Sequence, residues 1–197
     1  EYYDEHADVP TLYLGGWYDS YARATCENFT VLSQMKESRQ VLLMGPWTHG
    51  GWGVSYAGNI DFGSHSFINY NDLRLAWFDH FLKGLATEVT DWPPVKIFVM
   101  GTGEGKPNYQ GRLHHGGHWR DEKDFPLPDT RFTPYYLHGD SSLSPDSPQS
   151  HSPSRYSFDP RDPVPTIGGG ISAAGPIMQP GAYDQRGHTD FFGCTDT

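Results

Sequence analysis

The sequence predicts an α/β region over residues 1–92, followed by a β-rich region over residues 93–197 that we expect to form a β-sandwich. Apolar runs and amphipathic stretches alternate between residues 9 and 84, as in a parallel sheet with helical crossovers. After residue 94 this alternation stops. The chain also contains 23 Gly, 16 Pro and 15% aromatic residues, which favours short strands joined by turns over a helix bundle.

Two apolar runs predict the buried strands of the α/β region. Residues 11–14 end at Gly15-Gly16, and residues 40–44 end at Gly45-Pro46. Residues 21–37 place apolar side chains at helical spacing between these strands. Residues 71–83 predict a second helix, and the glycine that follows suits a helix C-terminus.

The β-rich region begins with residues 95–100, where side chains alternate as in a strand and no amphipathic helix follows. We therefore place a domain boundary near residue 92. Residues 133–138 and 154–158 predict further strands. The segment between them, residues 141–154, is rich in Ser and Pro, and a long exposed loop explains it better than a linker between domains.

The charge and cysteine content exclude several classes of protein. Lys and Arg number 14 against 24 Asp and Glu, for a net charge of −10, and the basic residues are scattered. We therefore expect no nucleic-acid partner. Apolar runs are far shorter than the roughly 20 residues of a membrane-spanning helix, so we expect no membrane segment. Cys26 and Cys194 are too distant in sequence to indicate a zinc ribbon or a disulfide-rich scaffold.

An acid and a histidine follow the two predicted strands. Asp19 comes just after the first strand, and His49 just after the second. If the strands are parallel, both residues lie at the carboxyl edge of the sheet, where α/β proteins build their sites. The order of acid and then histidine matches the last two members of an α/β-hydrolase triad. The alternative is structural: an Asp that caps the next helix and a loop His bonded to backbone.

Ser55 lies in a G-V-S-Y-A-G stretch that resembles the nucleophile elbow G-x-S-x-G. An elbow needs a buried strand leading into it and a helix leaving it. Ser55 has polar, glycine-broken sequence before it and no helical pattern directly after it. It also follows His49, contrary to the order Ser, Asp, His. We therefore predict a loop serine whose hydroxyl does not reach the His49 imidazole.

Two other groups of residues suggest ligand sites on first inspection. His114, His115 and His118 could begin a metal site, but glycines surround them and neither Cys nor paired carboxylates complete a tetrahedral set. Gly168-Gly169-Gly170 has no following Lys-Ser/Thr or amphipathic helix, so it predicts a turn and not a phosphate loop. We expect no metal and no cofactor.

Several short motifs follow one another along the chain. They are V-P-T to G-G-W-Y-D (residues 9–19), G-P-W-T-H-G (45–50), D-F-G (61–63), W-F-D-H-F-L-K-G (77–84), F-V-M-G (98–101), W-R (119–120) and D-P to P-V-P-T-I-G-G (159–169). In order and spacing they resemble the cocaine esterase and X-Pro dipeptidyl-peptidase group of serine hydrolases, also called CocE/NonD hydrolases. The segment around residues 114–118 is longer here than is usual in that family, so no role is transferred to it.

The resemblance implies a fold and a site. The chain would run from the C-terminal part of an α/β-hydrolase domain (residues 1–92) into the start of a jelly-roll β-sandwich (residues 93–197). Asp19 would be the acid of a catalytic triad and His49 its base. The nucleophilic Ser and a Tyr of the oxyanion hole would precede residue 1 in a longer protein, so we expect the isolated fragment to be nearly inactive.

Two functions follow from these observations. The first is hydrolysis of an ester or an X-Pro peptide, with a small-molecule ester or peptide as substrate. The alternative is a non-catalytic module whose aromatic-rich β region binds carbohydrate or peptide, as some jelly rolls do. An Asp and a His at adjacent strand ends have no purpose in such a module, which favours the enzyme.

Overall fold

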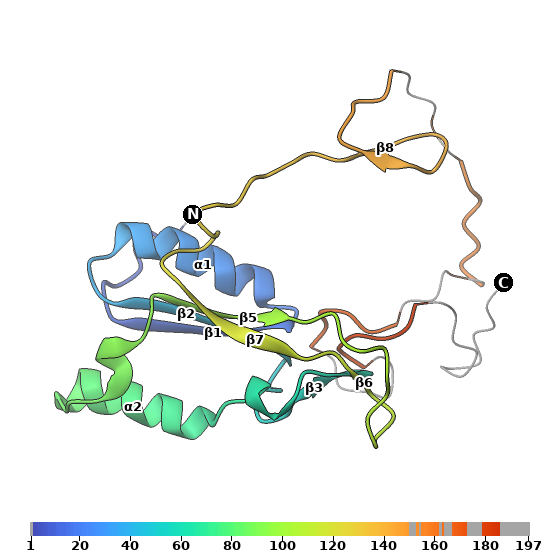
Figure 1. Cartoon of the computed structure of the whole chain (residues 1–197). Coiled ribbons are helices and arrows are strands. Elements are labelled where there is room, and N and C mark those ends of the chain that lie inside the picture. Colours follow the sequence, from blue (N-terminus) through green and yellow to red (C-terminus); the bar gives the residue numbers. More distant parts are fainter. Residues whose placement is uncertain are drawn as a thin grey trace. The chain divides into compact units, whose positions relative to one another are not determined.

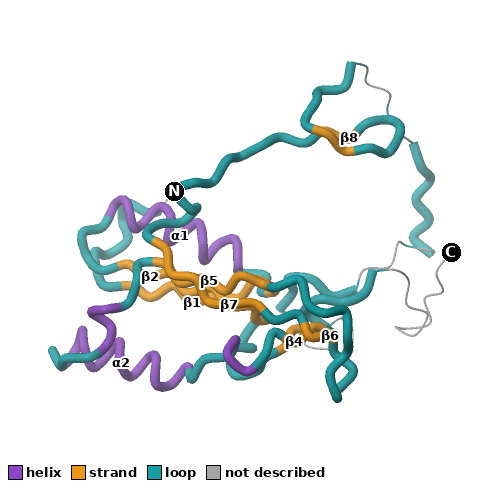
Figure 2. Tube along the Cα trace, in the orientation of Figure 1, coloured by secondary structure: helices purple, strands orange, loops and turns teal. Residues whose placement is uncertain are grey.

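A four-stranded mixed sheet is the largest sheet in the described part of the chain (Figures 1 and 2). The computed structural model describes residues 2–149, 153, 155–161, 163, 167–172 and 179–185. The strands are β1 (Thr11–Tyr18), β2 (Gln40–Thr48), β5 (Val95–Met100) and β7 (Gly117–Glu122), in the spatial order β1-β2-β5-β7. The first three run parallel, and β7 is antiparallel to β5.

The two long helices cover opposite faces of this sheet, as Figure 1 shows. Helix α1 (Ala22–Met35) connects β1 to β2, and its Phe29 and Leu32 pack with Leu42 and Met44 of β2. Helix α2 (Tyr70–Lys83) packs its Trp77 with Val41 on the other face. Strand β2 is therefore buried on both sides, which explains why its sequence is continuously apolar and does not alternate. The predicted α/β arrangement of residues 9–84 is confirmed.

Local signals fix the two ends of α2. Asn69 accepts hydrogen bonds from the backbone N–H groups of Asn71 and Asp72, and this side-chain cap begins the helix. Gly84 ends it in a left-handed conformation with φ of 67°, which favours glycine. The predicted glycine C-cap is thus confirmed. No helix in the described part of the chain is long and apolar enough to span a bilayer.

A small second sheet lies next to the carboxyl edge of the first. It comprises β3 (Tyr56–Ala57), β4 (Ile60–Asp61) and β6 (Leu113–His114). Its inner side packs around Phe62, which contacts Phe98 of β5 at a ring-centroid distance of 6.0 Å. Two short 3₁₀ helices flank α2 in the sequence: η1 (Ser64–Ser66) precedes it and η2 (Glu88–Asp91) follows it.

The first strands of the β-rich region belong to the same sheet as β1 and β2, since β5 pairs with β2 and β7 pairs with β5. The domain boundary expected near residue 92 stays a prediction, and the contacts within the structure group the residues into two compact units with other limits. One compact unit comprises Glu1–Pro128 and Ile167–Thr197, and the other is Asp129–Thr166. The alternating pattern of residues 95–100 predicted a strand correctly, but such a pattern does not specify which neighbour the strand pairs with.

The Asp129–Thr166 unit contains little regular structure. Its hairpin consists of β8 (Tyr136–Leu137) and β9 (Leu143–Ser144), so only the end of the strand predicted over residues 133–138 is formed. Of the strand predicted over residues 154–158, residue 154 lies outside the described residues and residues 155–158 form no strand, contrary to the prediction. Their aromatic side chains are exposed, and an apolar pattern without a covering layer does not stabilise a strand.

Candidate active site

Asp19 and His49 lie in direct contact at the carboxyl edge of the main sheet. The Nδ1 atom of His49 is 3.0 Å from Oδ2 of Asp19. Each residue comes directly after its strand, because β1 ends at Tyr18 and β2 ends at Thr48. The parallel pairing of β1 with β2 brings these ends together across 30 residues of sequence, as expected from the βαβ order.

A bulge in β2 brings the two side chains into register. Gly16 pairs with Gly45, but Tyr18 pairs with Thr48, so β2 contains one residue more than β1 over this stretch. Without the bulge Asp19 would face Thr48. The close approach also requires glycine at position 16, since a Cβ atom there would lie 2.2 Å from the Trp47 carbonyl oxygen. In the sequence, Gly15-Gly16 and Gly45-Pro46 suit strand ends, and the pattern does not reveal this bulge.

The Asp19 carboxylate is held at both oxygens. Oδ1 accepts a hydrogen bond of 2.9 Å from the Tyr21 backbone N–H, while Oδ2 contacts His49. Its side chain is only 9% exposed, compared with 51% for the side chain of His49. Asp19 therefore binds the turn before α1 and the imidazole as well, but it does not cap the helix as the structural alternative expected, because the N-cap is Tyr21 and has no side-chain cap hydrogen bond. The carboxylate is thus held by a contact that does not involve the histidine, and this contact orients the oxygen that binds the imidazole.

The contact determines which imidazole nitrogen faces solvent with a lone pair. An ionised carboxylate only accepts hydrogen bonds, so the neutral His49 ring places its proton on Nδ1. Its Nε2 atom is then free to take a proton from a neighbouring group. The Tyr21 ring lies beside the imidazole, with ring centroids 5.4 Å apart. This arrangement is suited to general acid–base chemistry.

Ser55 belongs to a different cluster. Its hydroxyl hydrogen-bonds to the Asp61 carboxylate, and its carbonyl accepts from the Phe62 N–H at 2.7 Å. No hydrogen bond between Ser55 and His49 occurs among the described residues. Burial raises the pKa of Asp61, but hydrogen bonds from Gly63, Ser55 and Asn108 outweigh it and lower that pKa below 3.8. Ser55 therefore helps to hold a carboxylate.

The three clustered histidines do not converge on one point. His114 lies in β6, His118 lies in β7 opposite Val99, and the His115 ring packs edge-on against Phe62. No group of three or more potential ligand side chains is close enough for a metal in the part of the chain that the structure describes.

The glycine run forms a turn beside the candidate site. Gly169 and Gly181 pair through two backbone hydrogen bonds of 2.7 and 3.0 Å. A Cβ atom at Gly170 would lie 3.3 Å from the Asp19 carbonyl oxygen, so residues 167–172 run against the backbone of the acid. Nothing in the sequence pattern indicated this proximity, since it depends on how distant segments pack.

Two family models match the chain. Residues 1–51 match the X-Pro dipeptidyl-peptidase S15 family, and residues 87–190, more than half of the chain, match the X-Pro dipeptidyl-peptidase C-terminal non-catalytic domain. The chain belongs to the family of X-Pro dipeptidyl-peptidases and CocE/NonD hydrolases. The expected family is therefore confirmed, and both Asp19 and His49 fall within the segment matched by the S15 peptidase family.

Individual relatives are much longer than this member of the family. It is 32% identical to the cocaine esterase of a Rhodococcus species over 173 residues, which is 82% of the chain and 27% of the esterase. It is 30% identical to a candidate serine esterase of Mycobacterium bovis over 76% of the chain and 21% of that protein. The crystal structure of a CocE/NonD hydrolase from Staphylococcus aureus matches 68% of the chain and 20% of that structure, with 20% identity and a TM-score of 0.43.

Proposed function

We propose that this family member acts as an acyl hydrolase on an ester or an X-Pro peptide, with Asp19 and His49 as two members of its catalytic triad. The observation that carries the proposal is the 3.0 Å contact between Nδ1 of His49 and Oδ2 of Asp19 at the sheet edge. The S15 peptidase match and the esterase relatives support the reaction class.

In the proposed reaction, Nε2 of His49 removes the hydroxyl proton of a nucleophilic serine. The serine oxygen attacks the substrate carbonyl, and His49 returns the proton to the departing alcohol or amine. Water, deprotonated by the same nitrogen, then releases the acid and restores the serine. Asp19 holds the Nδ1–H and stabilises the imidazolium form. We assign the serine to the part of a longer protein that precedes residue 1.

We also propose that the β-rich part of the chain contributes to the family's jelly-roll domain. The match of residues 87–190 to the C-terminal non-catalytic domain supports this assignment. In the structure, β5 of that segment pairs with β2, the strand that His49 follows, and β7 pairs with β5. We therefore assign this segment a role in supporting the sheet and assign it no catalytic residue.

The test compares variants of the full-length protein in turnover of an acyl ester and an X-Pro amide. Asp19→Asn and His49→Ala should each reduce kcat about 10³-fold or more, since triad members act as a unit. His80→Ala and Asp121→Asn are matched controls, because both side chains lie outside the site, on α2 and β7. Undiminished turnover in either triad variant would contradict the assignment.

A second measurement separates the enzyme from a binding module. Labelling of the full-length protein by a serine-reactive fluorophosphonate, blocked by a substrate ester, supports the hydrolase. Saturable glycan binding without labelling would instead support the non-catalytic alternative.

A further inference from the structure

A pocket next to the candidate active site contains an unusual combination of side chains. Its volume is about 360 Å³, within the range of small-molecule sites. Thr48, the residue before His49, forms one side, and Val54 and Tyr56 continue the same chain segment. Arg112 lines the pocket from the connection between β5 and β7, and Gln179 and Tyr183 line it from the C-terminal segment. No acidic residue is among the described residues that line it, in a chain of net charge −10.

Arg112 is held rigidly at this pocket. Its guanidinium lies over the Tyr56 ring, 3.7 Å from the ring centroid. Nε donates to the Gly58 carbonyl at 3.2 Å, and Nη1 donates to Oε1 of Gln110 at 2.9 Å. The hydrogen bonds of the described residues leave Nη2 available, and none of their ion pairs involves Arg112. A half-buried, pre-positioned guanidinium without a carboxylate partner is suited to an anionic ligand.

The pocket walls are fixed by backbone contacts. Gly58 forms a bridge with Ala182, and the Asn59 N–H donates to the Ala182 carbonyl at 2.8 Å. A Cβ atom on Gly58 would lie 2.4 Å from that carbonyl oxygen, so the two segments are in close contact. Burial raises the pKa of Tyr183, and the charge of Arg112 opposes that rise without cancelling it. The Tyr183 phenol is therefore neutral at neutral pH.

We propose that this pocket binds the carboxylate of a small apolar organic acid, with Arg112 as the partner of the anion. The hydroxyls of Thr48 and Tyr56 and the Gln179 amide provide additional polar groups, while Val54 and Pro180 provide an apolar wall. Arg112 is neither of the two proposed triad residues, and the proposed hydrolysis assigns no role to it. The proposed site therefore goes beyond that function.

The experiment measures binding of benzoate to the chain by isothermal titration calorimetry at low salt, with uncharged benzamide as the matched probe. Benzoate should bind at least about tenfold more tightly than benzamide, because only benzoate forms a charge-assisted hydrogen bond with Arg112. Arg112→Gln should weaken benzoate binding by a similar factor and leave benzamide unchanged. The proposal is overturned by equal affinity for the two probes. It is also overturned if benzoate at about 20 mM, about 100 times the protein concentration in the calorimeter cell, does not bind.

Arg74 provides a matched control variant. Its guanidinium also lies over a tyrosine ring, 4.4 Å from the Tyr70 centroid, but outside the pocket. Arg74→Gln should therefore leave benzoate affinity unchanged, and an equal loss in this variant would show that the effect of Arg112→Gln comes from net charge alone. Because binding is measured without turnover, absence of benzoate binding would not contradict the proposed hydrolysis. Conversely, undiminished turnover in the triad variants would not contradict the proposed anion pocket.

A second variant keeps the test decisive if Arg112→Gln does not fold. Val54→Glu places a carboxylate on the pocket wall and leaves the contact between Arg112 and Tyr56 in place. It should weaken benzoate binding about tenfold through repulsion of the anion and competition for Arg112. Unchanged benzoate affinity in a folded Val54→Glu protein would contradict the proposal.

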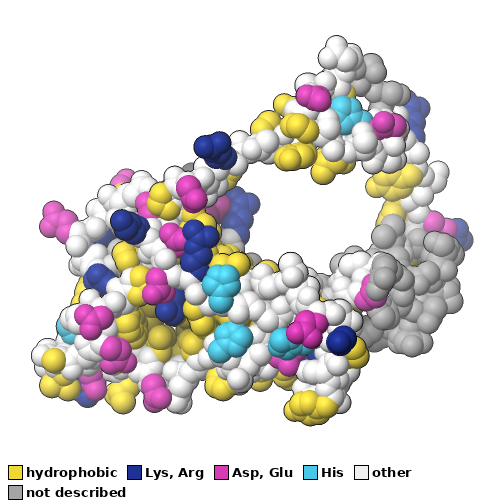
Figure 3. Space-filling model, viewed as in Figure 1, with side chains coloured by type: hydrophobic (Ala, Val, Ile, Leu, Met, Phe, Trp, Pro, Cys, Tyr) yellow, Lys and Arg dark blue, Asp and Glu magenta, His cyan; other side chains and the backbone are white. Residues whose placement is uncertain are grey.

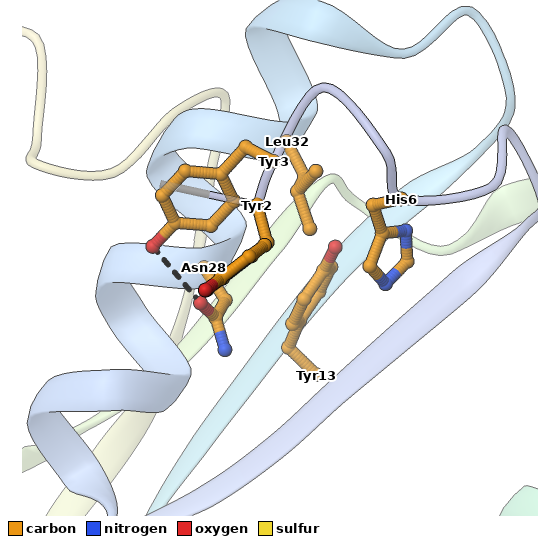
Figure 4. A pocket seen from close by; sticks show the side chains of 6 residues that line it. All are labelled: Tyr2, Tyr3, His6, Tyr13, Asn28 and Leu32. Carbon is orange, nitrogen blue, oxygen red and sulfur yellow. Dashed lines mark hydrogen bonds between the residues drawn. The ribbon is translucent and has the colours of Figure 1, made fainter.

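A second hollow among the described residues supports no comparable proposal. It has a volume of about 370 Å³ and lies between the amino-terminal residues and α1 (Figure 4). The Tyr3 hydroxyl already donates to Oδ1 of Asn28, and the Tyr13 hydroxyl donates to Gln40. On the face shown in Figure 3, acidic and basic side chains are mixed, and no basic stripe crosses it.

Discussion

The β1–α1–β2 segment and the Asp129–Thr166 unit both carry large apolar side chains, but only the first buries them. Phe29 and Leu42 are 1% and 0% exposed, whereas Phe132 and Leu137 are 85% and 82% exposed. The first segment has a helix on each face of its sheet, while the second has a hairpin of two-residue strands. An apolar pattern therefore stabilises a strand only where another layer covers it.

The largest expected effect tests this contrast with one substitution in each region. Phe29→Ala should lower the free energy of unfolding by about 3–5 kcal/mol, since it leaves a cavity between α1 and the sheet. Phe132→Ala should change it by less than about 0.5 kcal/mol, because an exposed ring loses few contacts. Urea unfolding followed by tryptophan fluorescence measures both variants. The signal reports unfolding of the region around the sheet, since all six tryptophans precede residue 129.

The wild-type chain and Phe158→Ala serve as controls for that pair. The Phe158 side chain is also exposed, at 68%, so this variant should unfold with the wild type. A shift for Phe132→Ala as large as that for Phe29→Ala would show that residues 129–166 share the core of the sheet, and the contrast would be lost.

A smaller effect is expected from adding a single methyl group. Gly16→Ala places a Cβ atom against the Trp47 carbonyl and should destabilise the chain by about 1–3 kcal/mol. Gly139→Ala, in the other unit, meets no atom within 4 Å and should change stability by less than about 0.5 kcal/mol. Thermal unfolding followed by circular dichroism measures both variants. Equal melting temperatures would mean that β1 and β2 do not approach as closely as described.

The sequence predicted the first region well because its signals are local. Helix periodicity, the Gly84 cap and two apolar runs specify α1, α2, β1 and β2 without reference to the rest of the chain. The order of these elements then placed Asp19 and His49 at one edge of the sheet, where their side chains meet. Their catalytic roles stay a proposal.

The features that the sequence did not predict depend on contacts between distant segments. The bulge that aligns Asp19 with His49 lies within G-P-W, a sequence that equally suits a strand end. The pairing of β5 with β2 joins residues about 50 positions apart, and alternation alone does not identify that neighbour. The position of Gly170 beside Asp19 joins segments about 150 residues apart. The pattern of residues along the chain does not reveal such contacts.

The smallest expected effect compares two carboxylates, one in each unit. Asp61 is partly buried and accepts hydrogen bonds from the Gly63 N–H at 3.0 Å and from Asn108 at 2.8 Å. Asp61→Asn should lower the free energy of unfolding by about 1–2 kcal/mol at pH 7, because the new amide nitrogen cannot accept the hydrogen bond that Asn108 donates. Asp140 also has a lowered pKa, through hydrogen bonds from Ser142, but it is fully exposed. Asp140→Asn should therefore have little effect on unfolding.

The pH dependence distinguishes stabilisation by the charge of Asp61 from stabilisation by its hydrogen-bond geometry. The folded-state pKa of Asp61 lies below its ordinary value of 3.8, so the carboxylate contributes its full stability above that value. The contribution falls as pH decreases through the lowered pKa, where both the folded and the unfolded chain bind the proton. Thermal unfolding at pH 7, 5 and 3 should therefore show a constant difference between wild type and Asp61→Asn down to about pH 4, and a smaller difference at pH 3. A difference that stays constant to pH 3 would show that the hydrogen-bond geometry around Asp61, and not its charge, stabilises the small sheet.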